Sequence, residues 1–346
     1  MNKKKAKRIG ILTAGGDCPG LNAAIRGVAK TAIVQHGMEV YGFRAGYTGL
    51  LEKDYIEFNN THMSGLLTAG GTILGTSREK PFKAPKGEDH NPKPDIIKQN
   101  YEEMGLDALV CIGGNGTMKT ANKLSELGLN VVGIPKTIDN DVWGTDVTFG
   151  FDSALSIATD AIDRLHTTAN SHQRVMIIEV MGHHAGWIAL YAGMAGGGDI
   201  ILIPELEYNI RSVCKKIEER YESNKPYSIV VVAEGIERPK GMSAARHLSE
   251  AIHTYTDIET RETVLGYVQR GGSPTPMDRI LATRYGAHAT DCIARGEYGT
   301  MVAIENNELT TIPLVEVSDR LSLVTPEHSL IQQGRRMGVS FGDEYL

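Results

Sequence analysis

Two glycine-rich stretches of the sequence have the composition of phosphate-binding loops. TAGGDCPGLN begins at Thr13 and GGNGT begins at Gly113, and each follows an apolar run and precedes a segment with a helical pattern. Glycine lets the backbone approach a ligand closely, and the amide groups at the start of the following helix attract negative charge. Tight strand-to-helix turns also contain glycine, so a structural turn is the alternative interpretation of either loop alone. GGNGT lacks the GxxxxGK[ST] pattern of a Walker A loop, but two such loops in one predicted sheet favour a polyphosphate site.

A third stretch, PKTIDND from Pro135, supplies two carboxylates. Asp139 and Asp141 lie two positions apart, so both side chains would point to the same side of an extended segment. Like charges this close are costly unless a cation or a proton-transfer step uses them. One carboxylate could take the proton from a hydroxyl while the other helps to hold Mg²⁺. An aspartate-rich turn is the alternative interpretation, and the neighbouring glycine loops lead us to favour a functional one.

Four arginines lie at predicted strand edges or beside glycines and could bind phosphate oxygens. They are Arg78, Arg174, Arg261 and Arg270. The guanidinium group matches phosphate oxygens because its N–H donors form a planar fork. A solvated surface position is the usual alternative for any single arginine, but four of them near strand ends agree better with phosphate recognition.

The elements that must position these side chains alternate between strands and helices. Apolar, mostly non-alternating runs predict parallel strands that are covered on both faces. Helical patterns at residues 22–35, 152–169 and 275–294 indicate an α/β fold with doubly wound sheets, in which ligands bind at the carboxyl ends of strands. We also expect a hairpin around Asn306-Asn307 and an exposed loop over residues 79–94. The predicted strands cover residues 8–13, 39–43, 107–112, 131–135, 175–180, 200–203, 228–233 and 263–267.

The composition of the 346-residue chain narrows the class of protein. A net charge of −6 argues against a nucleic-acid binder, whose contact surface would be basic. No apolar run approaches the ~18 residues that cross a membrane. Four scattered cysteines without a CxxC pair predict buried thiols in a reducing compartment, not a disulfide framework or a zinc site. The lysine-rich start is followed by no apolar segment with a cleavage site and is interpreted as a solvated tail. We therefore expect a cytoplasmic protein with no nucleic-acid or membrane partner.

Several stretches, spread in order over most of the chain, resemble the phosphofructokinase family. They are GILTAGGDCPGLNAAIR, GGTILGTSR, the GGNGT loop, PKTIDND, RVMIIEVMG and TVLGYVQRGGSPTPMDRILATRYG. The resemblance implies transfer of a phosphoryl group to the 1-hydroxyl of fructose 6-phosphate. It also implies an α/β fold of two similar doubly wound domains with mostly parallel sheets and the active site in the cleft between them. The donor-binding domain would cover residues 1–150 and about 271–318, and the sugar-phosphate-binding domain residues 151–270 and about 319–346. Family members usually form homotetramers or dimers of dimers, in which a neighbour completes the sugar-phosphate site.

The resemblance further implies roles for individual residues. Asp139 resembles the general base, and Thr137 resembles the residue that hydrogen-bonds near the transferred phosphoryl group, with Lys136 and His183 as further catalytic positions. Asn115 and Asp141 match the positions that would hold Mg²⁺. The donor-binding positions are Gly15, Arg78, Glu79, Gly114, Asn115, Gly116 and Thr117. The substrate-binding positions are Thr137, Ile138, Asp139, Arg174, Met181, Gly182, His183, Glu234, Arg261, Tyr267, Gln269 and Arg270, of which Arg174 and Arg261 commonly reach the 6-phosphate from the adjacent subunit.

Two positions bear on the phosphoryl donor. Pyrophosphate users of the family typically have aspartate at the position of Gly116 and lysine at that of Lys136, whereas the best-known bacterial ATP users have glycine at both. A carboxylate at position 116 would crowd and repel the α-phosphate of ATP, and Lys136 can serve either donor. We therefore favour ATP and the subgroup of ATP users that are otherwise similar to pyrophosphate enzymes. A pyrophosphate-dependent fructose-6-phosphate 1-phosphotransferase is the alternative.

Three positions depart from the family pattern. Asn115 replaces an aspartate that helps to bind Mg²⁺, His183 replaces an arginine near the transferred group, and Tyr267 replaces a histidine that commonly contacts the 6-phosphate. These departures motivate a second alternative, a catalytically weak sugar-phosphate-binding or regulatory homologue, although the retained Asp139 and Thr137 argue against it. A NAD or lipid kinase is a third alternative, which the PKTIDND and QRGGSP motifs argue against.

Overall fold

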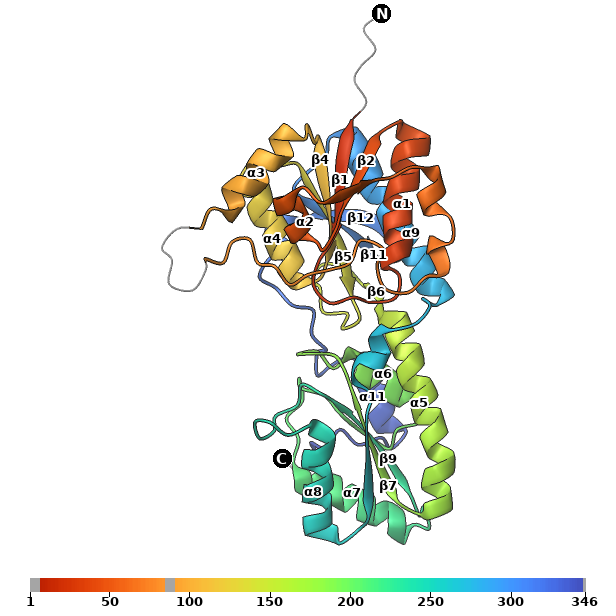
Figure 1. The fold of residues 1–346 in the computed structure, drawn as a ribbon. Coiled ribbons are helices and arrows are strands. Elements are labelled where there is room, and N and C mark those ends of the chain that lie inside the picture. Colours follow the sequence, from red (N-terminus) through yellow and green to blue (C-terminus); the bar gives the residue numbers. More distant parts are fainter. Residues whose placement is uncertain (1–6, 85–90, 345–346) are drawn as a thin grey trace, which may run out of the picture. The chain divides into compact units, whose positions relative to one another are not determined.

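The computed structural model describes residues 7–84 and 91–344, and the chain divides into two compact α/β units (Figure 1). The first unit comprises Met1–Thr137, Asp141–Asp152 and Arg270–Leu321, and the second comprises Ile138–Asn140, Ser153–Gln269 and Ser322–Leu346. Each unit has a mostly parallel sheet with helices on both faces. The predicted fold class is confirmed, and the assignment of the donor and the sugar phosphate to separate domains stays a prediction.

The sheet of the first unit is parallel in its centre and antiparallel at both edges. Its strand order is β12-β11-β5-β4-β1-β2-β3, and β6 pairs with the end of β5. The strand order reverses between β1 and β4, and ligands of open α/β sheets bind at such a reversal. The strands are β1 (Arg8–Thr13), β2 (Glu39–Phe43), β3 (Tyr55–Glu57), β4 (Ala108–Gly113), β5 (Val131–Thr137), β6 (Phe149–Gly150), β11 (Thr300–Glu305) and β12 (Glu308–Pro313).

Helices cover both faces of this sheet, with α1 and α9 on one face and α3 and α4 on the other (Figure 1). α1 and α9 approach each other closely, since a Cβ on Gly27 would lie 2.7 Å from the carbonyl oxygen of Thr283, and one on Gly286 would lie 2.5 Å from that of Ala24. Both positions therefore require glycine. The helices are α1 (Leu21–Lys30), α2 (Tyr47–Glu52), α3 (Lys93–Glu103), α4 (Asn115–Glu126), α9 (Pro276–Arg295) and α10 (Leu314–Val317).

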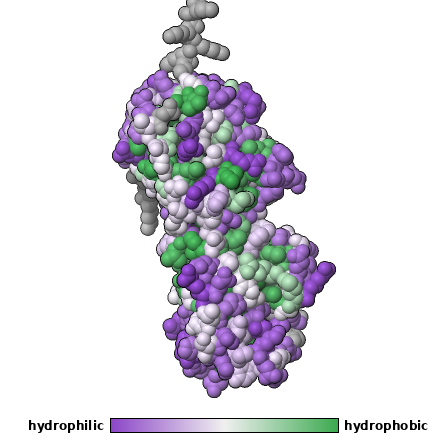
Figure 2. Space-filling model, turned by 90° about the vertical axis from the view of Figure 1, so that its right-hand side faces the viewer, coloured by the Kyte–Doolittle hydropathy of each residue, from purple (hydrophilic) through white to green (hydrophobic). Residues whose placement is uncertain are grey.

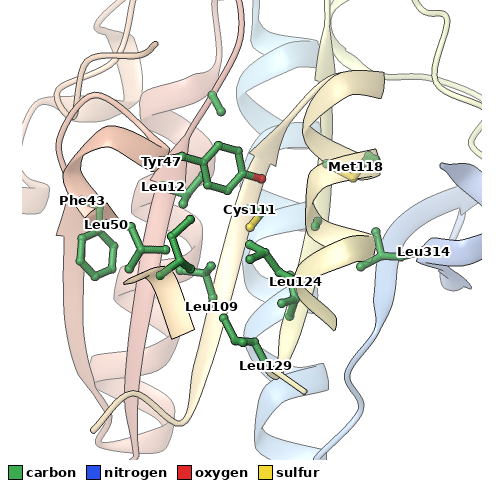
Figure 3. Packing of buried hydrophobic residues seen from close by; sticks show 14 of the residues in the cluster. Leu12, Phe43, Tyr47, Leu50, Leu109, Cys111, Met118, Leu124, Leu129 and Leu314 are labelled. Carbon is green, nitrogen blue, oxygen red and sulfur yellow. The ribbon is translucent and has the colours of Figure 1, made fainter. Parts of the chain in front are cut away.

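The core beside the GGNGT loop is built from β4, α4 and the strands next to them (Figure 3). Leu109 and Cys111 on β4 are fully buried and belong to one apolar cluster with Leu12 on β1 and Leu124 on α4. Full burial of a leucine side chain contributes about 1.5–3 kcal/mol. This packing holds α4 against β4 and thereby fixes the loop that joins them.

Among the described residues, the second unit contains four parallel strands in the order β10-β7-β9-β8. α7 and α8 pack on one face of this sheet, where Ile217 and Leu248 join an apolar cluster with Ile177 on β7 and Val232 on β9. The strands are β7 (Val175–Val180), β8 (Ile200–Leu202), β9 (Ser228–Ala233) and β10 (Thr260–Val264). The helices are α5 (Phe151–His172), α6 (Trp187–Ala195), α7 (Ile210–Glu222), α8 (Ala244–Thr256) and α11 (Ser329–Arg336).

Most predicted elements match the observed ones to within a few residues. The hairpin is confirmed: β11 and β12 pair in antiparallel register around Asn306 and Asn307, whose φ angles of 51° and 68° are left-handed. The helix predicted at residues 275–294 is α9, with the Thr275 side chain accepting the N–H of Asp278 at its start. The helix predicted at residues 22–35 is α1 followed by a π-helical turn at Thr31–Gln35.

Two predicted segments differ from the structure. The strand predicted at residues 263–267 is wrong, because β10 covers Thr260–Val264 and a 3₁₀ segment follows at Gly266–Arg270. β10 is an edge strand with mostly exposed polar side chains, so it lacks an apolar pattern, and the apolar run that suggested a strand includes Gly266 with a left-handed φ of 51°. The loop predicted over residues 79–94 ends earlier, since α3 begins at Lys93; residues 85–90 of it lie outside the described residues.

Figure 2 shows hydrophilic residues over much of one face of the molecule, with smaller hydrophobic patches between them. No helix in the described part of the chain is long and apolar enough to cross a membrane. The prediction of buried thiols is confirmed, since all four cysteines are free and buried. Burial raises the pKa of the Cys18 and Cys111 thiols to about 12, so these thiols stay protonated at neutral pH.

Candidate active site

The carboxyl ends of β1, β4 and β5 lie side by side, and the three stretches with candidate chemistry follow these strands. In the sheet register, Thr13 pairs with Ile112 and Gly113 pairs with Pro135. Both glycine loops and the start of PKTIDND therefore meet at the carboxyl ends of the central strands of the first unit's sheet. We call residues 13–17, 113–117 and 135–137 the strand-end cluster.

In the loop after β1, Gly15 is tied to the segment that precedes Arg78. The N–H of Gly15 donates to the carbonyl oxygen of Ser77 at 3.0 Å, and Oγ1 of Thr76 donates to the carbonyl oxygen of Gly15 at 2.7 Å. Gly15 has a left-handed φ of 85°, which favours glycine. The structure thus brings two predicted donor-binding positions, Gly15 and the segment of Arg78, next to each other.

In the GGNGT loop, glycine allows close packing at one position and leaves open space at another. A Cβ on Gly113 would lie 2.1 Å from Oγ1 of Thr117, whereas a Cβ on Gly116 would meet no atom of residues 7–84 and 91–344 within 4 Å. α4 begins at Asn115 with Gly114 as its N-cap, and neither a capping side chain nor an acidic residue occupies its first turn. The first amide groups of α4 and the positive end of its dipole can therefore bind an anion.

Lys136 and Arg270 bring positive charge to the strand-end cluster. Nζ of Lys136 donates to the carbonyl oxygen of Gly16, and Nη1 of Arg270 donates to that of Asp17 at 3.1 Å. Lys136 is only 3% exposed, and a buried ammonium is costly unless it is hydrogen-bonded and close to negative charge. These two cations suit an anionic ligand. Arg270, which was predicted as a substrate-binding residue, belongs to the first unit and lies beside the loop that follows β1.

Arg78 also lines an open hollow of about 410 Å³ on the first unit, together with Glu79, Lys80, Lys83 and Lys93. The carboxylate of Glu79 accepts a hydrogen bond from Nζ of Lys93 at 2.8 Å. The cations of this hollow outnumber its carboxylate, which favours a phosphate-bearing molecule. The two predicted donor-binding residues Arg78 and Glu79 thus share one surface feature.

The PKTIDND segment is buried and turns sharply. Thr137, Asp139 and Asp141 are 7–8% exposed, and Oγ1 of Thr148 donates to the carbonyl oxygen of Thr137 at 2.8 Å. Asn140 has a left-handed φ of 52°, which asparagine tolerates better than most residues. The extended geometry that predicted both carboxylates on one side of the segment is therefore wrong at Asn140. Ile138 in the same segment is fully buried and apolar.

Asn115 provides the test of whether this site fits a divalent cation. Its Nδ2 donates to the carbonyl oxygen of Asp141 at 3.3 Å, while its Oδ1 is buried and has no hydrogen-bond partner among the described residues. A buried amide oxygen without a partner costs free energy, and such oxygens are ligands for Mg²⁺. The described residues contain no group of three or more His, Cys, Asp or Glu that could hold a metal. Mg²⁺ is usually held by one or two carboxylates together with substrate phosphates, and the amide oxygen of Asn115 would add a neutral ligand to such a site.

In the second unit, side chains from two other segments hold three successive main-chain amides after β7. The N–H of Met181 donates to Oε1 of Gln269 at 2.8 Å, and the N–H groups of Gly182 and His183 donate to Oε1 of Glu234 at 3.3 and 3.0 Å. We call residues 181–183 the clamped loop. The structure brings these five predicted substrate-binding residues together, and the fully buried carboxamide of Gln269 supports the loop.

His183 adopts an unusual backbone conformation in the clamped loop. Its φ is 54°, in the left-handed region that non-glycine residues rarely adopt. A Cβ on Gly235 would lie 2.1 Å from the carbonyl oxygen of His183, so only glycine lets the segment after β9 approach this loop. The rings of His183 and His184 lie edge to face, with their centroids 3.9 Å apart. Strained residues of this kind concentrate at functional sites.

Arg174 and Arg261 lie at the opposite end of the second sheet from the clamped loop. Arg174 precedes β7 and the clamped loop follows it, and a six-residue strand spans about 20 Å. Glu259 joins the two arginines, since its Oε2 lies 2.6 Å from Nε of Arg174 and 3.4 Å from Nη2 of Arg261. Within one chain, the structure therefore does not bring these arginines to the clamped loop. Tyr267, after β10, is 76% exposed.

Sequence reasoning missed three residues that contact these sites. Ser77 binds the β1 loop through its carbonyl oxygen, Glu259 pairs with two candidate arginines, and Arg238 binds the carbonyl oxygen of Glu234. Ser77 lies in the GGTILGTSR motif, where attention to the whole motif could have found it. No motif marks Glu259 or Arg238, because their partners come from the fold or from main-chain atoms.

Comparisons with known proteins agree with this architecture. A family model described as Phosphofructokinase matches residues 8–293. The chain is 62% identical to ATP-dependent 6-phosphofructokinase 3 of Bacteroides thetaiotaomicron, over 97% of this chain and 100% of that protein. It is 53% identical to ATP-dependent 6-phosphofructokinase of Spirochaeta thermophila, over 99% of this chain and 100% of that protein. Among solved structures, Pichia pastoris phosphofructokinase in the T-state matches with a TM-score of 0.83 and 33% identity, over 92% of this chain and 36% of that chain.

Proposed function

The chain belongs to the phosphofructokinase family, and we propose that it is a glycolytic enzyme that transfers the γ-phosphoryl group of ATP to the 1-hydroxyl of D-fructose 6-phosphate. The products are D-fructose 1,6-bisphosphate and ADP. Relatives that are 62% and 53% identical over their whole length are ATP-dependent 6-phosphofructokinases, which supports both the activity and the donor. We also propose a cytoplasmic location, which a glycolytic role supports.

The observation that carries this proposal is the strand-end cluster. Two glycine loops, the uncapped start of α4 and the buried ammonium of Lys136 gather at the point where the strand order reverses. Amide groups, a helix dipole and fixed cations stabilise a polyphosphate without covalent chemistry, which is what phosphoryl transfer requires of a protein. The open space at Gly116 accommodates the α-phosphate of ATP.

Asp139 is the general base of the proposed reaction. Its carboxylate takes the proton of the 1-hydroxyl as that oxygen attacks the γ-phosphorus, and the bond from this phosphorus to the β–γ bridging oxygen breaks. ADP leaves with the electron pair of that bond. Lys136 and Thr137, which lie in the same PKTIDND segment as Asp139, stabilise the charge on the transferred group, and His183 contributes from the clamped loop.

Mg²⁺ is the cofactor that this reaction implies. Oδ1 of Asn115 and the carboxylate of Asp141 would hold it together with the donor phosphates, and the partnerless buried Oδ1 supports the first of these ligands. When bound, the ion neutralises negative charge on the phosphates. Asn115 provides an oxygen without a negative charge, so the donor phosphates carry more of the ion's coordination than they would beside an aspartate.

The sugar phosphate is recognised by the second unit. The clamped loop and Glu234 contact the sugar, and Tyr267, whose side chain is 76% exposed, offers its hydroxyl to the 6-phosphate. Arg174 and Arg261 lie about 20 Å along β7 from that loop, so they cannot serve the same sugar site within one chain. We propose that a second copy of the chain supplies these two arginines, and that the working enzyme is a homodimer or homotetramer.

A coupled assay of fructose 1,6-bisphosphate formation tests the proposed function. The expected result is turnover with ATP, fructose 6-phosphate and Mg²⁺, no turnover without Mg²⁺, and at least a hundredfold lower rate with pyrophosphate. Turnover with pyrophosphate and none with ATP would make the chain a pyrophosphate-dependent enzyme instead. Binding of fructose 6-phosphate without turnover from either donor would identify a regulatory homologue.

A further inference from the structure

Arg238 lies between β9 and α8 and donates hydrogen bonds to main-chain carbonyl oxygens of its own segment. Its Nε donates to the carbonyl oxygen of Met242 at 2.9 Å, and its Nη1 donates to those of Ile236, at 3.1 Å, and Glu234. None of these partners is a carboxylate. A planar guanidinium fixes the directions of its donors, so this side chain shapes the turn formed by residues 234–242.

This turn carries the carboxylate that holds the clamped loop. Oε1 of Glu234 accepts the N–H groups of Gly182 and His183, and Gly235 allows the turn to approach the carbonyl oxygen of His183. A contact at the main chain of Glu234 therefore helps to fix where its carboxylate and the clamped loop lie. Arg238 is therefore linked to the clamped loop through Glu234 alone, without any contact between Arg238 and a substrate.

A second anchor holds the turn at a different point. The hydroxyl of Tyr208 donates to the carbonyl oxygen of Glu237 at 2.9 Å. The N–H of Glu234 donates to the carbonyl oxygen of Val180 at 2.9 Å and so continues the β7–β9 pairing. The turn should therefore remain folded when Arg238 is replaced, while the orientation of Glu234 loses its direct support.

We propose that Arg238 is a positioning residue for fructose 6-phosphate, acting through Glu234 and the clamped loop. This inference rests on the proposed function, in which Glu234 contacts the sugar. Arg238 supports the main chain of Glu234, so that Oε1 stays in position to accept the loop amides. Loss of the guanidinium removes one support of Glu234 and so weakens the hold of its carboxylate on the clamped loop.

Substitution of Arg238 with a matched control tests the inference. Arg238→Met removes the guanidinium, and Arg238→Lys keeps the charge but loses the fork. Arg246→Met is the control, since the guanidinium of Arg246 pairs with Glu250 on the surface of α8. We expect Arg238→Met to weaken fructose 6-phosphate binding, measured by calorimetry, by about tenfold and to leave the KM for ATP within about twofold. Arg238→Lys should be intermediate, and Arg246→Met should match the wild type.

A double-mutant cycle separates positioning from general destabilisation. If Arg238 acts through Glu234, the variant with Glu234→Gln and Arg238→Met should bind fructose 6-phosphate about as weakly as Glu234→Gln alone. The proposal would be overturned if the fold losses in affinity of the two single variants multiply in the double variant. Equal rises in the KM values for ATP and fructose 6-phosphate would also overturn it and indicate a merely structural role.

Hydrogen exchange gives a readout that needs no substrate. Without ligand, the amides of Gly182 and His183 should exchange about tenfold faster in Arg238→Met than in the wild type or in Arg246→Met. Unchanged exchange in all three proteins would overturn the inference even if the enzyme is active. A third outcome separates the two proposals. If the wild type neither binds nor phosphorylates fructose 6-phosphate but Arg238→Met still exchanges faster, the link from Arg238 to the clamped loop is supported and the proposed function is refuted.

Discussion

Gly116 should determine whether the chain can use ATP, and its replacement by aspartate would test this. A Cβ at this position would meet no atom of the described residues within 4 Å, and Gly116 does not have a left-handed φ. It is the second residue of α4, where no acidic residue interacts with the helix dipole. An aspartate there should therefore leave the fold intact and stabilise α4 by about 0.3–1 kcal/mol.

The same carboxylate should oppose ATP strongly. Two like charges about 5 Å apart in an effective dielectric of about 20 repel each other by roughly 3 kcal/mol. A change of this size lowers kcat/KM by about a hundredfold, since each 1.36 kcal/mol is tenfold. Pyrophosphate has no α-phosphate at that position, so any residual activity with pyrophosphate should fall less.

Steady-state kinetics of Gly116→Asp and Gly116→Asn separate charge from volume. Both side chains are nearly the same size, so crowding would impair the two variants equally, whereas repulsion should impair only the aspartate variant. We expect kcat/KM for ATP to fall about a hundredfold in Gly116→Asp and the melting temperature to be unchanged or raised. Wild-type kcat/KM for ATP in Gly116→Asp would refute the placement of the α-phosphate beside Gly116.

Three further predictions concern the metal, the packing and the pH dependence. Asn115→Asp should lower the Mg²⁺ concentration for half-maximal rate by about tenfold; an unchanged Mg²⁺ titration would show that the ion is held elsewhere. Gly235→Ala should lower the free energy of unfolding in urea by about 1–3 kcal/mol, because the added Cβ would lie 2.1 Å from the carbonyl oxygen of His183; an effect no larger than that of Gly116→Ala would contradict the close approach. Burial raises the pKa of Glu205, whose Oε2 has no hydrogen-bond partner in the part of the chain that the structure describes. The folded state therefore binds more protons than the unfolded one, and the stability contributed by this carboxyl is complete below the unfolded pKa of about 4.3 and is lost as the pH rises through the folded value. The unfolding free energy of Glu205→Gln minus that of the wild type should therefore increase as the pH rises through that window. A difference that stays constant with pH would contradict this.

Both sheets were largely predictable because their buried parallel strands are continuous apolar runs. β1, β2, β7 and β9 have the predicted bounds, since strands covered on both faces contrast sharply with the polar turns at their ends. β10 was misplaced because an edge strand with exposed threonine, arginine and glutamate side chains carries no such contrast.

The candidate site was predictable where the chemistry lies in short motifs. The glycine loops and PKTIDND are contiguous in sequence, and the sheet register brings them together at one edge. The turn at Asn140 was not predictable, because a left-handed φ at an asparagine depends on its surroundings. Arg238 and Glu259 were missed for a different reason: they act on main-chain carbonyls and on distant side chains, and residue type alone does not reveal either kind of partner.

The turnover number of Asp139→Asn with ATP, Mg²⁺ and saturating fructose 6-phosphate tests the central claim most directly. Asparagine keeps the size of the side chain and cannot accept the proton of the 1-hydroxyl. If Asp139 is the general base, kcat should fall by about 10²–10⁴-fold, while the dissociation constant for fructose 6-phosphate, measured by calorimetry without donor, should change little. A kcat equal to that of the wild type would contradict the account.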